Sequence, residues 1–212
     1  MKILNLYAGI GGNRKLWGDE HEITAVENVP EIANIYADFF PKDKVVIADA
    51  HQYLLEHFAE FDFIWSSPPC PSHSRIRKNC AWKDRGNGYK ELQNKPVFPD
   101  MKLYEEIIFL KHYFEGKWVV ENVQPFYDYL IEPNVILDRH PIWSNFLIIK
   151  IKFTNERKHI KIITRKKNQT VYGFNVGKYN IEKEWILLRN CMNPEIGLHI
   201  LKEALKETPK LF

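Results

Sequence analysis

Short apolar runs alternate with amphipathic stretches over residues 2–121, and this alternation constrains the fold more than any other feature of the chain. Short apolar runs bounded by turn residues are typical of buried strands, whereas a 3.6-residue period is typical of helices. Regular strand–helix alternation predicts right-handed β-α-β units and a largely parallel sheet. We therefore predict a doubly wound α/β fold. The expected strands are residues 2–7, 22–27, 45–48, 61–65 and 118–121, and the expected helices are residues 13–18, 30–39, 51–59, 101–114 and 194–206.

The rest of the chain is less regular. Residues 71–99 carry turn formers and basic groups without a clear period, which predicts a long loop. Runs typical of strands occur at residues 146–153 and 160–164. The 212 residues are enough for one α/β domain and few for two. We expect a core over residues 1–146, a small basic variable segment over residues 147–186, and a C-terminal helical segment over residues 187–212 that returns to the core.

The composition excludes several classes of protein. Hydrophobic residues make up 45% of the chain and charged residues 27%, which are ordinary values for a globular domain. No apolar run approaches the roughly 20 residues that span a bilayer, and the first residues lack the pattern of a signal peptide. The three cysteines are irregularly spaced, which argues against a disulfide framework and for a reducing compartment. We expect a cytoplasmic protein.

Positive charge is concentrated in two segments of the chain. Residues 75–95 hold seven Lys and Arg against two Asp and Glu, and residues 150–183 hold ten against two. The net charge of the whole chain is only +3, so the remaining residues are acidic on balance. Such asymmetry is typical of a basic face that binds a polyanion, although a solvated charged surface would give the same counts.

The first three expected strands end in residues suited to a nucleoside. A turn with glycines at positions 9, 11 and 12 follows the first strand, and such a turn lets the backbone approach a ligand closely. Glu27 ends the second strand, where a carboxylate can accept both hydrogen bonds of a ribose diol. Asp49 ends the third strand and is placed to accept a hydrogen bond from an adenine amino group. No phosphate-binding Gly-x-x-x-x-Gly-Lys motif is present, which argues against nucleoside triphosphate hydrolysis.

The fourth and fifth strands end in reactive groups. Cys70 follows two prolines at the end of the fourth strand and precedes the basic loop. We expect a nucleophile whose pKa is lowered by Arg75, Arg77 and a helix N-terminus. A buried structural cysteine, or a metal site with His73 and Cys80, is the weaker alternative, and we predict no metal.

Glu121 ends the fifth strand among valines. Desolvation in such surroundings raises the pKa of a carboxyl group, which predicts a general acid; an ion-paired structural glutamate is the alternative.

The order of these motifs resembles that of the C5-cytosine DNA methyltransferases, in a compact form like that found in phage and prophage genomes. Residues 5–12, Asn-Leu-Tyr-Ala-Gly-Ile-Gly-Gly, resemble the family's first motif, Asp-Leu-Phe-Ala-Gly-x-Gly-Gly. Pro69-Cys70 resembles the catalytic Pro-Cys, and residues 121–123 resemble Glu-Asn-Val. Residues 189–197 loosely resemble the C-terminal Gly-Asn-Ala-Val-Pro motif, with Asn190 in the cofactor-facing position.

The resemblance implies a Rossmann-like, class I S-adenosylmethionine-dependent methyltransferase that acts on C5 of a flipped-out cytosine in DNA. Cys70 would attack C6 of the base, Glu121 would protonate N3, and Arg139 would hold the cytosine carbonyl. The implied catalytic residues are Cys70, Glu121, Asn122 and Arg139; the implied cofactor-binding residues are Tyr7, Ala8, Gly9, Gly11, Gly12, Glu27, Asn28, Asp49, Ala50, Pro69 and Asn190; and the residues expected to bind the nucleic acid are Ser74, Arg75, Arg77 and Lys78.

Several positions depart from the family pattern. Asn5 replaces the usual Asp, Tyr7 replaces Phe, and Pro71 stands where Gln is normal. The Gln-x-Arg-x-Arg motif is missing, and Arg139 is its nearest substitute. Three alternatives therefore stay open: an RNA cytosine-5 methyltransferase on the same scaffold, a related enzyme that uses an altered donor, and a catalytically silent nucleic-acid-binding protein.

Overall fold

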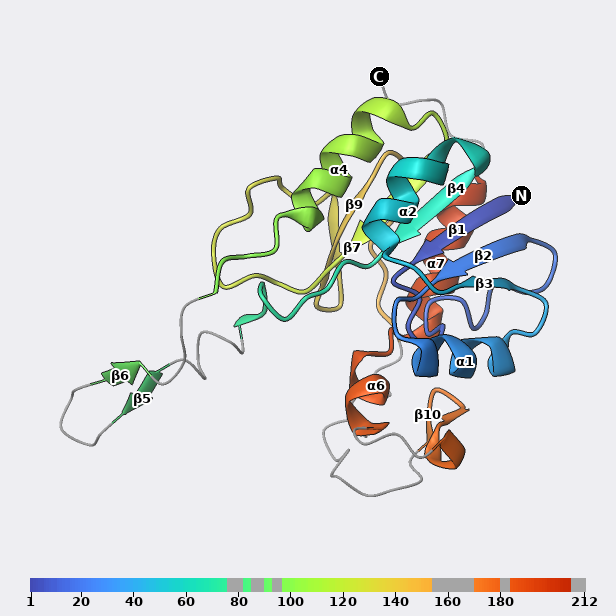
Figure 1. Ribbon diagram of the computed structural model, residues 1–212. Coiled ribbons are helices and arrows are strands. Elements are labelled where there is room, and N and C mark those ends of the chain that lie inside the picture. Colours follow the sequence, from blue (N-terminus) through green and yellow to red (C-terminus); the bar gives the residue numbers. More distant parts are fainter. Residues whose placement is uncertain (76–81, 85–89, 93–96, 154–169, 180–183, 207–212) are drawn as a thin grey trace.

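A seven-stranded sheet with helices on both faces forms the core of the computed structural model, which describes residues 1–75, 82–84, 90–92, 97–153, 170–179 and 184–206 (Figure 1). The strand order is β3-β2-β1-β4-β7-β9-β8. All neighbours from β3 to β7 are parallel, and β9 is antiparallel to β7 and β8. The strands are β1 (Lys2–Leu6), β2 (Glu22–Val26), β3 (Lys44–Val46), β4 (Phe63–Ser66), β7 (Lys117–Glu121), β8 (Val135–Leu137) and β9 (His140–Ser144), and the main helices are α1 (Pro30–Phe39), α2 (Ala50–His57), α4 (Lys102–Tyr113), α6 (Glu184–Asn190) and α7 (Pro194–Leu205).

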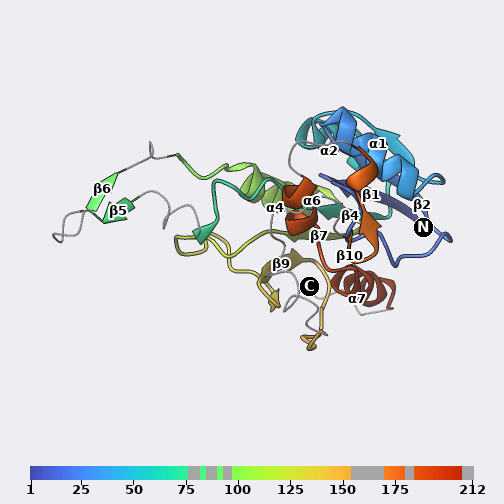
Figure 2. The ribbon, with the colours of Figure 1, turned by 90° about the horizontal axis from the view of Figure 1, so that it is seen from below.

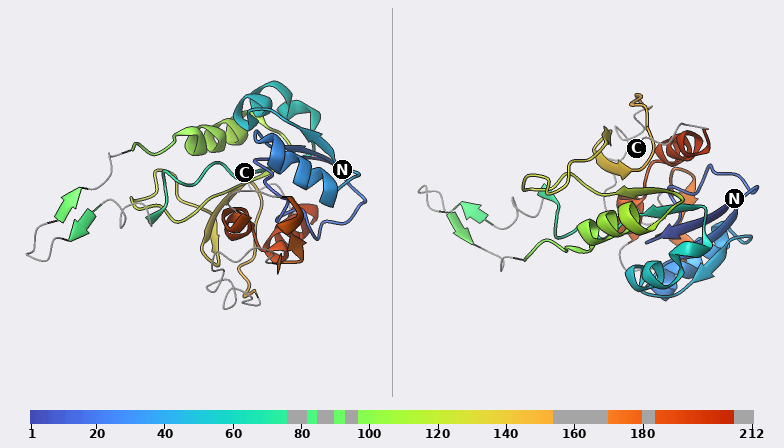
Figure 3. Two further views of the ribbon diagram at one scale, coloured as in Figure 1. Left: turned by 60° about the horizontal axis from the view of Figure 1, so that its bottom comes forward. Right: turned by 90° about the horizontal axis from the view of Figure 1, so that it is seen from above.

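Side chains that alternate along β1 divide the core into two layers. Leu4 and Leu6 point to the face that α2 and α4 cover, and Ile3 points to the face that α7 covers. Figure 3 shows α2 and α4 on one side of the sheet and α7 on the other. All three side chains are fully buried, and each contributes roughly 1.5–3 kcal/mol to folding. This arrangement confirms the predicted doubly wound, Rossmann-like α/β fold.

Residues 13–18 do not form the expected helix. They form successive turns, because their side chains are drawn inward in different directions. Asn13 hydrogen-bonds Asn5 of β1, Arg14 donates to both carboxylate oxygens of Asp43 at 2.8 and 3.0 Å, and Trp17 is buried against the sheet. A six-residue helix gains too little from its own hydrogen bonds to resist these tertiary contacts.

The loop expected over residues 71–99 contains regular structure, so that prediction was wrong in part. Within it, β5 (Trp82–Asp84) pairs antiparallel with β6 (Lys90–Leu92). A second small antiparallel pair follows later, between β10 (Thr170–Val171) and β11 (Phe174–Asn175). Strands of two or three residues are too short to show an alternation of apolar and polar residues, so the sequence did not predict these hairpins.

The strand expected over residues 146–153 is also absent, and residues 160–164 lie outside the described residues. Phe146 and Ile148 are buried while Leu147 and Ile149 are exposed, so the alternation is real, but none of the described strands pairs with this segment. Ser144 is the last residue of β9, and its hydroxyl donates to the carbonyl of Phe146, two residues beyond the end of the strand. The domain boundaries at residues 146 and 186 remain a prediction.

Gly197 of α7 provides a test of how tightly that helix packs. A Cβ atom at this position would lie 2.1 Å from the carbonyl oxygen of Asn13, so Gly197→Ala forces the helix away from the turn. Alanine gains about 1 kcal/mol in helix propensity, but overpacking against backbone typically costs 1–3 kcal/mol. We expect a net loss of up to about 2 kcal/mol in the free energy of unfolding, measured by urea denaturation.

The matched control is Lys202→Ala, which changes an exposed residue of the same helix and should alter stability by less than about 0.5 kcal/mol. A Gly197→Ala protein more stable than the native protein would contradict this packing.

Candidate active site

The carboxyl ends of β1, β4 and β7 surround a cavity of about 350 Å³. In open parallel sheets ligands bind beyond these strand ends. α6 lies in front of the ends of β4 and β7 in Figure 2, and the residues after it complete the cavity wall. The cavity brings together these predicted site residues: Tyr7, Ala8, Gly9, Gly12, Pro69, Cys70, Glu121, Asn122, Arg139 and Asn190.

The glycine turn after β1 owes its shape to left-handed backbone. Tyr7 and Gly9 both have a φ angle of +55°, and the amide of Gly9 donates to Glu27 at 3.0 Å. No atom lies within 4 Å of a Cβ built on Gly9, so this residue leaves open space beside the cavity. Gly11 does not line the cavity. A Cβ there would collide with Tyr36 and Phe40, so Gly11 lets the turn pack against α1.

Four of the residues expected to bind the nucleoside also lie outside the cavity lining. Both carboxylate oxygens of Glu27 accept backbone amides, from Gly9 and Val29, so Glu27 fixes the glycine turn. Asp49 is exposed and caps α2 by accepting the amide of Gln52, which lowers its pKa. Asn28 is exposed and Ala50 is buried as the first residue of α2. Their roles toward a cofactor remain predictions.

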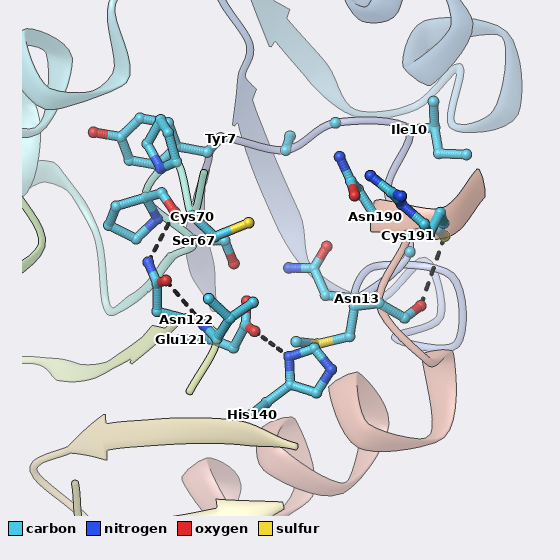
Figure 4. Close-up of a pocket in the computed structure, with 18 of the residues that line it drawn as sticks. Tyr7, Ile10, Asn13, Ser67, Cys70, Glu121, Asn122, His140, Asn190 and Cys191 are labelled. Carbon is cyan, nitrogen blue, oxygen red and sulfur yellow. Dashed lines mark hydrogen bonds and ion pairs between the residues drawn. The ribbon is translucent and has the colours of Figure 1, made fainter. Parts of the chain in front are cut away.

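Cys70 follows a turn that Asn122 ties to the sheet. The side-chain amide of Asn122 donates to the carbonyl of Pro68 at 3.0 Å, and its oxygen accepts the amide of Val123. This pair of bonds fixes the end of β4 beside the end of β7. The Cys70 sulfur points into the cavity in Figure 4, with Glu121 and Asn190 also at its wall.

The pKa of Cys70 is raised, not lowered as expected. Burial is the main cause, and the nearby charge of Glu121 adds to it. Arg139 and Arg189 oppose the shift, whereas Arg75 does not take part, because its Nε donates to the carbonyl of Pro125. Burial and Glu121 therefore disfavour the thiolate, and the expectation about Arg75 was wrong. Sequence adjacency to basic residues did not reveal which way their side chains turn.

Glu121 has a partner that the sequence reading missed. The Nδ1 atom of His140, the first residue of β9, hydrogen-bonds the Glu121 carboxylate. Both side chains are nearly buried, and both line the cavity. The antiparallel register of β7 and β9 causes this contact, because it pairs Glu121 with Ile142, two residues from His140. The sequence offered one signal for this contact, because His140 directly follows Arg139, which was already a predicted site residue.

Further lining residues were not among the predicted site residues. Arg189 precedes Asn190 at the end of α6, and Met192 follows on the way to α7. Asn13 reaches the cavity from the turns after β1. The Gly12 backbone contacts this junction, since a Cβ on Gly12 would lie 2.6 Å from the Cys191 sulfur. Residues far apart in the sequence thus close the cavity together.

The expected nucleic-acid contacts are only partly described. Ser74 bridges to Pro125, and Arg75 is exposed beside it. Arg77 and Lys78 lie outside the described residues. His73 is buried, and its Nδ1 hydrogen-bonds the hydroxyl of Tyr127. Neither Ser74 nor Arg75 lines the cavity, so their contact with a nucleic acid remains a prediction.

The amino-terminal part of this site has a match among known families. The sequence model of the C-5 cytosine-specific DNA methylases matches residues 1–93. This match covers less than half of the chain, and within it the chain is similar to the family. The methylase match includes the glycine turn, Glu27, Asp49 and the Pro69-Cys70 pair. Glu121 and Arg139 lie beyond it.

Solved structures similar to the chain include a mutant of Spodoptera frugiperda DNMT2, with 27% identity over 59% of this chain and 36% of that one, at a TM-score of 0.39. A hypothetical protein of Thermus thermophilus has 13% identity over 71% of this chain and 75% of that one, at a TM-score of 0.45. A protein described as a DNA modification methyltransferase of an Escherichia coli prophage has 17% identity over 60% of this chain and 33% of that one, at a TM-score of 0.38. The chain thus spans about a third of the first and third proteins. No curated protein gives a significant match.

Among the described residues, no helix has both the length and the apolar character to cross a membrane.

The effect of Glu121 on Cys70 can be measured directly. Glu121→Gln removes a negative charge that raises the pKa of the Cys70 thiol, so more thiolate should be present at pH 8. We expect iodoacetamide to alkylate Cys70 faster in this variant than in the native protein, as measured by mass spectrometry of the peptide that holds Cys70.

Glu105→Gln is the matched control, because it removes a carboxylate from α4, away from the cavity lining, and should leave the alkylation rate unchanged. An equal or slower rate in Glu121→Gln would show that Glu121 does not act on the thiol.

Proposed function

We propose that the protein transfers a methyl group from S-adenosylmethionine to C5 of a flipped-out cytosine in DNA. The observation that carries the proposal is that the Cys70 sulfur, Glu121 and the glycine turn share one cavity at the carboxyl edge of the sheet. A nucleophile, a proton-carrying group and a turn that admits a ligand are the parts this reaction needs. The similarity of residues 1–93 to the C-5 cytosine-specific DNA methylases supports the same choice of base and position.

The residues present suit S-adenosylmethionine. The left-handed turn from Tyr7 to Gly9 exposes backbone beside open space, and Pro69 lines the same cavity. Glu27 accepts the amide of Gly9 and so fixes the turn whose residues would hold the cofactor. Tyr7, Ala8, Gly9, Pro69 and Asn190 are the residues expected to contact it. When bound, S-adenosylmethionine supplies the methyl group that C5 receives.

Cys70 and Glu121 would act on opposite sides of the cytosine ring system. C5 is a weak nucleophile until the Cys70 thiolate adds to C6, which turns the ring into an enamine. Glu121 would hold a proton at N3 so that negative charge does not build up on the base. After C5 is methylated, loss of its proton reforms the double bond and expels Cys70. His140 orients Glu121, and Asn122 holds the turn that carries Cys70.

The raised pKa of Cys70 sets a requirement on this chemistry. The thiol must lose its proton when the substrate arrives, although burial and Glu121 oppose that loss. A proton held by Glu121 at N3 removes the opposing charge, so base binding itself would favour the thiolate. The positive charges of Arg139 and Arg189 also lower the pKa of Cys70 and so favour the thiolate. The base must leave the duplex to reach these groups, since stacked bases are inaccessible.

The decisive experiment is mass spectrometry of nucleosides from nucleic acid incubated with the purified protein and S-adenosylmethionine. We expect 5-methyl-2′-deoxycytidine among the nucleosides released from DNA. Cys70→Ala should abolish the product while S-adenosylmethionine still binds, and Glu121→Gln should lower the rate by about 10²–10³-fold. Loss of cofactor binding in a folded Cys70→Ala protein would count against the assignment of Cys70.

Parallel reactions with tRNA separate the alternatives. Methylation of tRNA cytosine alone would replace DNA by RNA as the substrate. Cofactor binding without any methylated product would favour an altered donor or a silent nucleic-acid-binding protein. A near-native rate for Glu121→Gln would remove Glu121 from the mechanism.

A further inference from the structure

A buried carboxylate lies directly behind the site. Glu106 of α4 is fully buried, and its two oxygens accept hydrogen bonds from three side chains on three other segments. The hydroxyl of Tyr7 lies 2.6 Å from Oε1, Nδ1 of His51 lies 3.0 Å from the same atom, and the hydroxyl of Ser66 lies 2.5 Å from Oε2. Glu106 therefore connects the turn after β1, the end of β4 and the start of α2.

Stability alone does not account for a carboxylate at this position. The neighbouring buried residues of α4 are Leu103, Ile107 and Leu110, so position 106 belongs to the apolar stripe of the helix. Removing a carboxylate from water costs several kcal/mol, and apolar residues of similar volume usually serve a core as well or better. Glu106 does what no apolar side chain can do, which is to accept several hydrogen bonds at one point.

Two of its three partners are continuous with the cavity wall. Tyr7 lines the cavity itself and is followed by Ala8 and Gly9. Its left-handed backbone is uncommon for an aromatic residue and requires support from its surroundings. The bond to Glu106 provides that support. Burial and the Glu106 charge raise the pKa of Tyr7, so the hydroxyl keeps its proton and remains a donor.

The third and fourth members of the network complete it. Ser66 is the last residue of β4 and immediately precedes Ser67, which lines the cavity on the way to Cys70. The hydrogen bond to Glu106, 3.0 Å from Nδ1, raises the pKa of His51, which favours the positively charged imidazolium. The other groups that face His51 are Glu105, 3.6 Å from Nε2, and Lys102, which opposes the shift.

We propose that Glu106 is a positioning residue that fixes Tyr7 and the end of β4 in one arrangement for S-adenosylmethionine, with His51 as its counter-charge. This inference rests on the proposed function. Glu106 touches neither the cavity nor any reacting atom; it acts through Tyr7 and Ser66. Its removal should weaken cofactor binding even where the fold is intact.

The test is Glu106→Gln in the full chain, with S-adenosylmethionine binding measured by isothermal titration calorimetry. Glutamine keeps the shape of the Glu106 side chain but has one acceptor oxygen instead of two. Either Tyr7 or Ser66 therefore loses the oxygen to which its hydroxyl donates. A hydrogen bond to a charged group is worth 1.5–3 kcal/mol, so we expect the dissociation constant to rise about tenfold or more. Glu115→Gln is the matched control, because it changes an exposed carboxylate just after α4, and it should change the dissociation constant less than about twofold.

Two further readouts separate positioning from a purely structural role. Tyr7→Phe should weaken binding in the native background but have a much smaller effect in the Glu106→Gln background, because the two residues act through one bond. The affinity of the native protein should fall as pH rises through the raised pKa of His51, since the counter-charge is complete below about 6.5 and is lost above the raised value. Glu106→Gln should lack this decline.

The outcomes are distinct. Native protein that binds no S-adenosylmethionine would overturn the proposed function, and this inference with it. Native-like binding by a folded Glu106→Gln protein, or additive effects of Tyr7→Phe and Glu106→Gln, would overturn the positioning role alone. If Glu106→Gln does not fold, Tyr7→Phe and Ser66→Ala each remove one donor, and unchanged affinity in both would overturn the inference.

Discussion

Parallel pairing of β1, β4 and β7 is the constraint on which the site depends. The registers pair Leu6 with Ser66 and Ser66 with Val120, so these strands end at one level. Residues at or just beyond these strand ends therefore line one cavity. They are the glycine turn after β1, Cys70 after β4 and Glu121 at the end of β7. Backbone hydrogen bonds in the sheet, and not contacts between the reactive side chains, bring the parts together.

Buried polar groups hold the glycine turn from both faces of the sheet. On the α4 face, Glu106 accepts the hydroxyl of Tyr7. On the α1 face, Asn13 bonds Asn5, and Arg14 pairs with Asp43, both of those charged side chains being about 4% exposed or less. Each group has its partners, so the cost of burying it is largely offset. A strained turn between two satisfied polar clusters has few alternative conformations available to it.

Local pattern was enough to predict β1, β2, β3, β4 and β7 and to single out Cys70 and Glu121 near the ends of two of them, because a buried strand and the residue that ends it are both visible in a short window. The turns at residues 13–18 were not predictable, since the tertiary partners of Arg14 overrode local preference. His140 reaches Glu121 only through the register of β9, a strand that no periodicity announced. Glu106 did leave a signal: an acidic residue within the apolar stripe of α4. Its three partners could be found only in the folded chain.

The role of α7 has a consequence for biosynthesis. Ile196 and Ile200 cover the sheet face that carries Ile3 and Trp65, and Met192 just before α7 forms part of the cavity wall. While a ribosome is still translating the middle of the message, β1, β2 and β4 can pair, but one face of their sheet stays bare. That face is covered only after residues 194–205 have left the ribosome, so until then the nascent chain exposes apolar surface that favours aggregation.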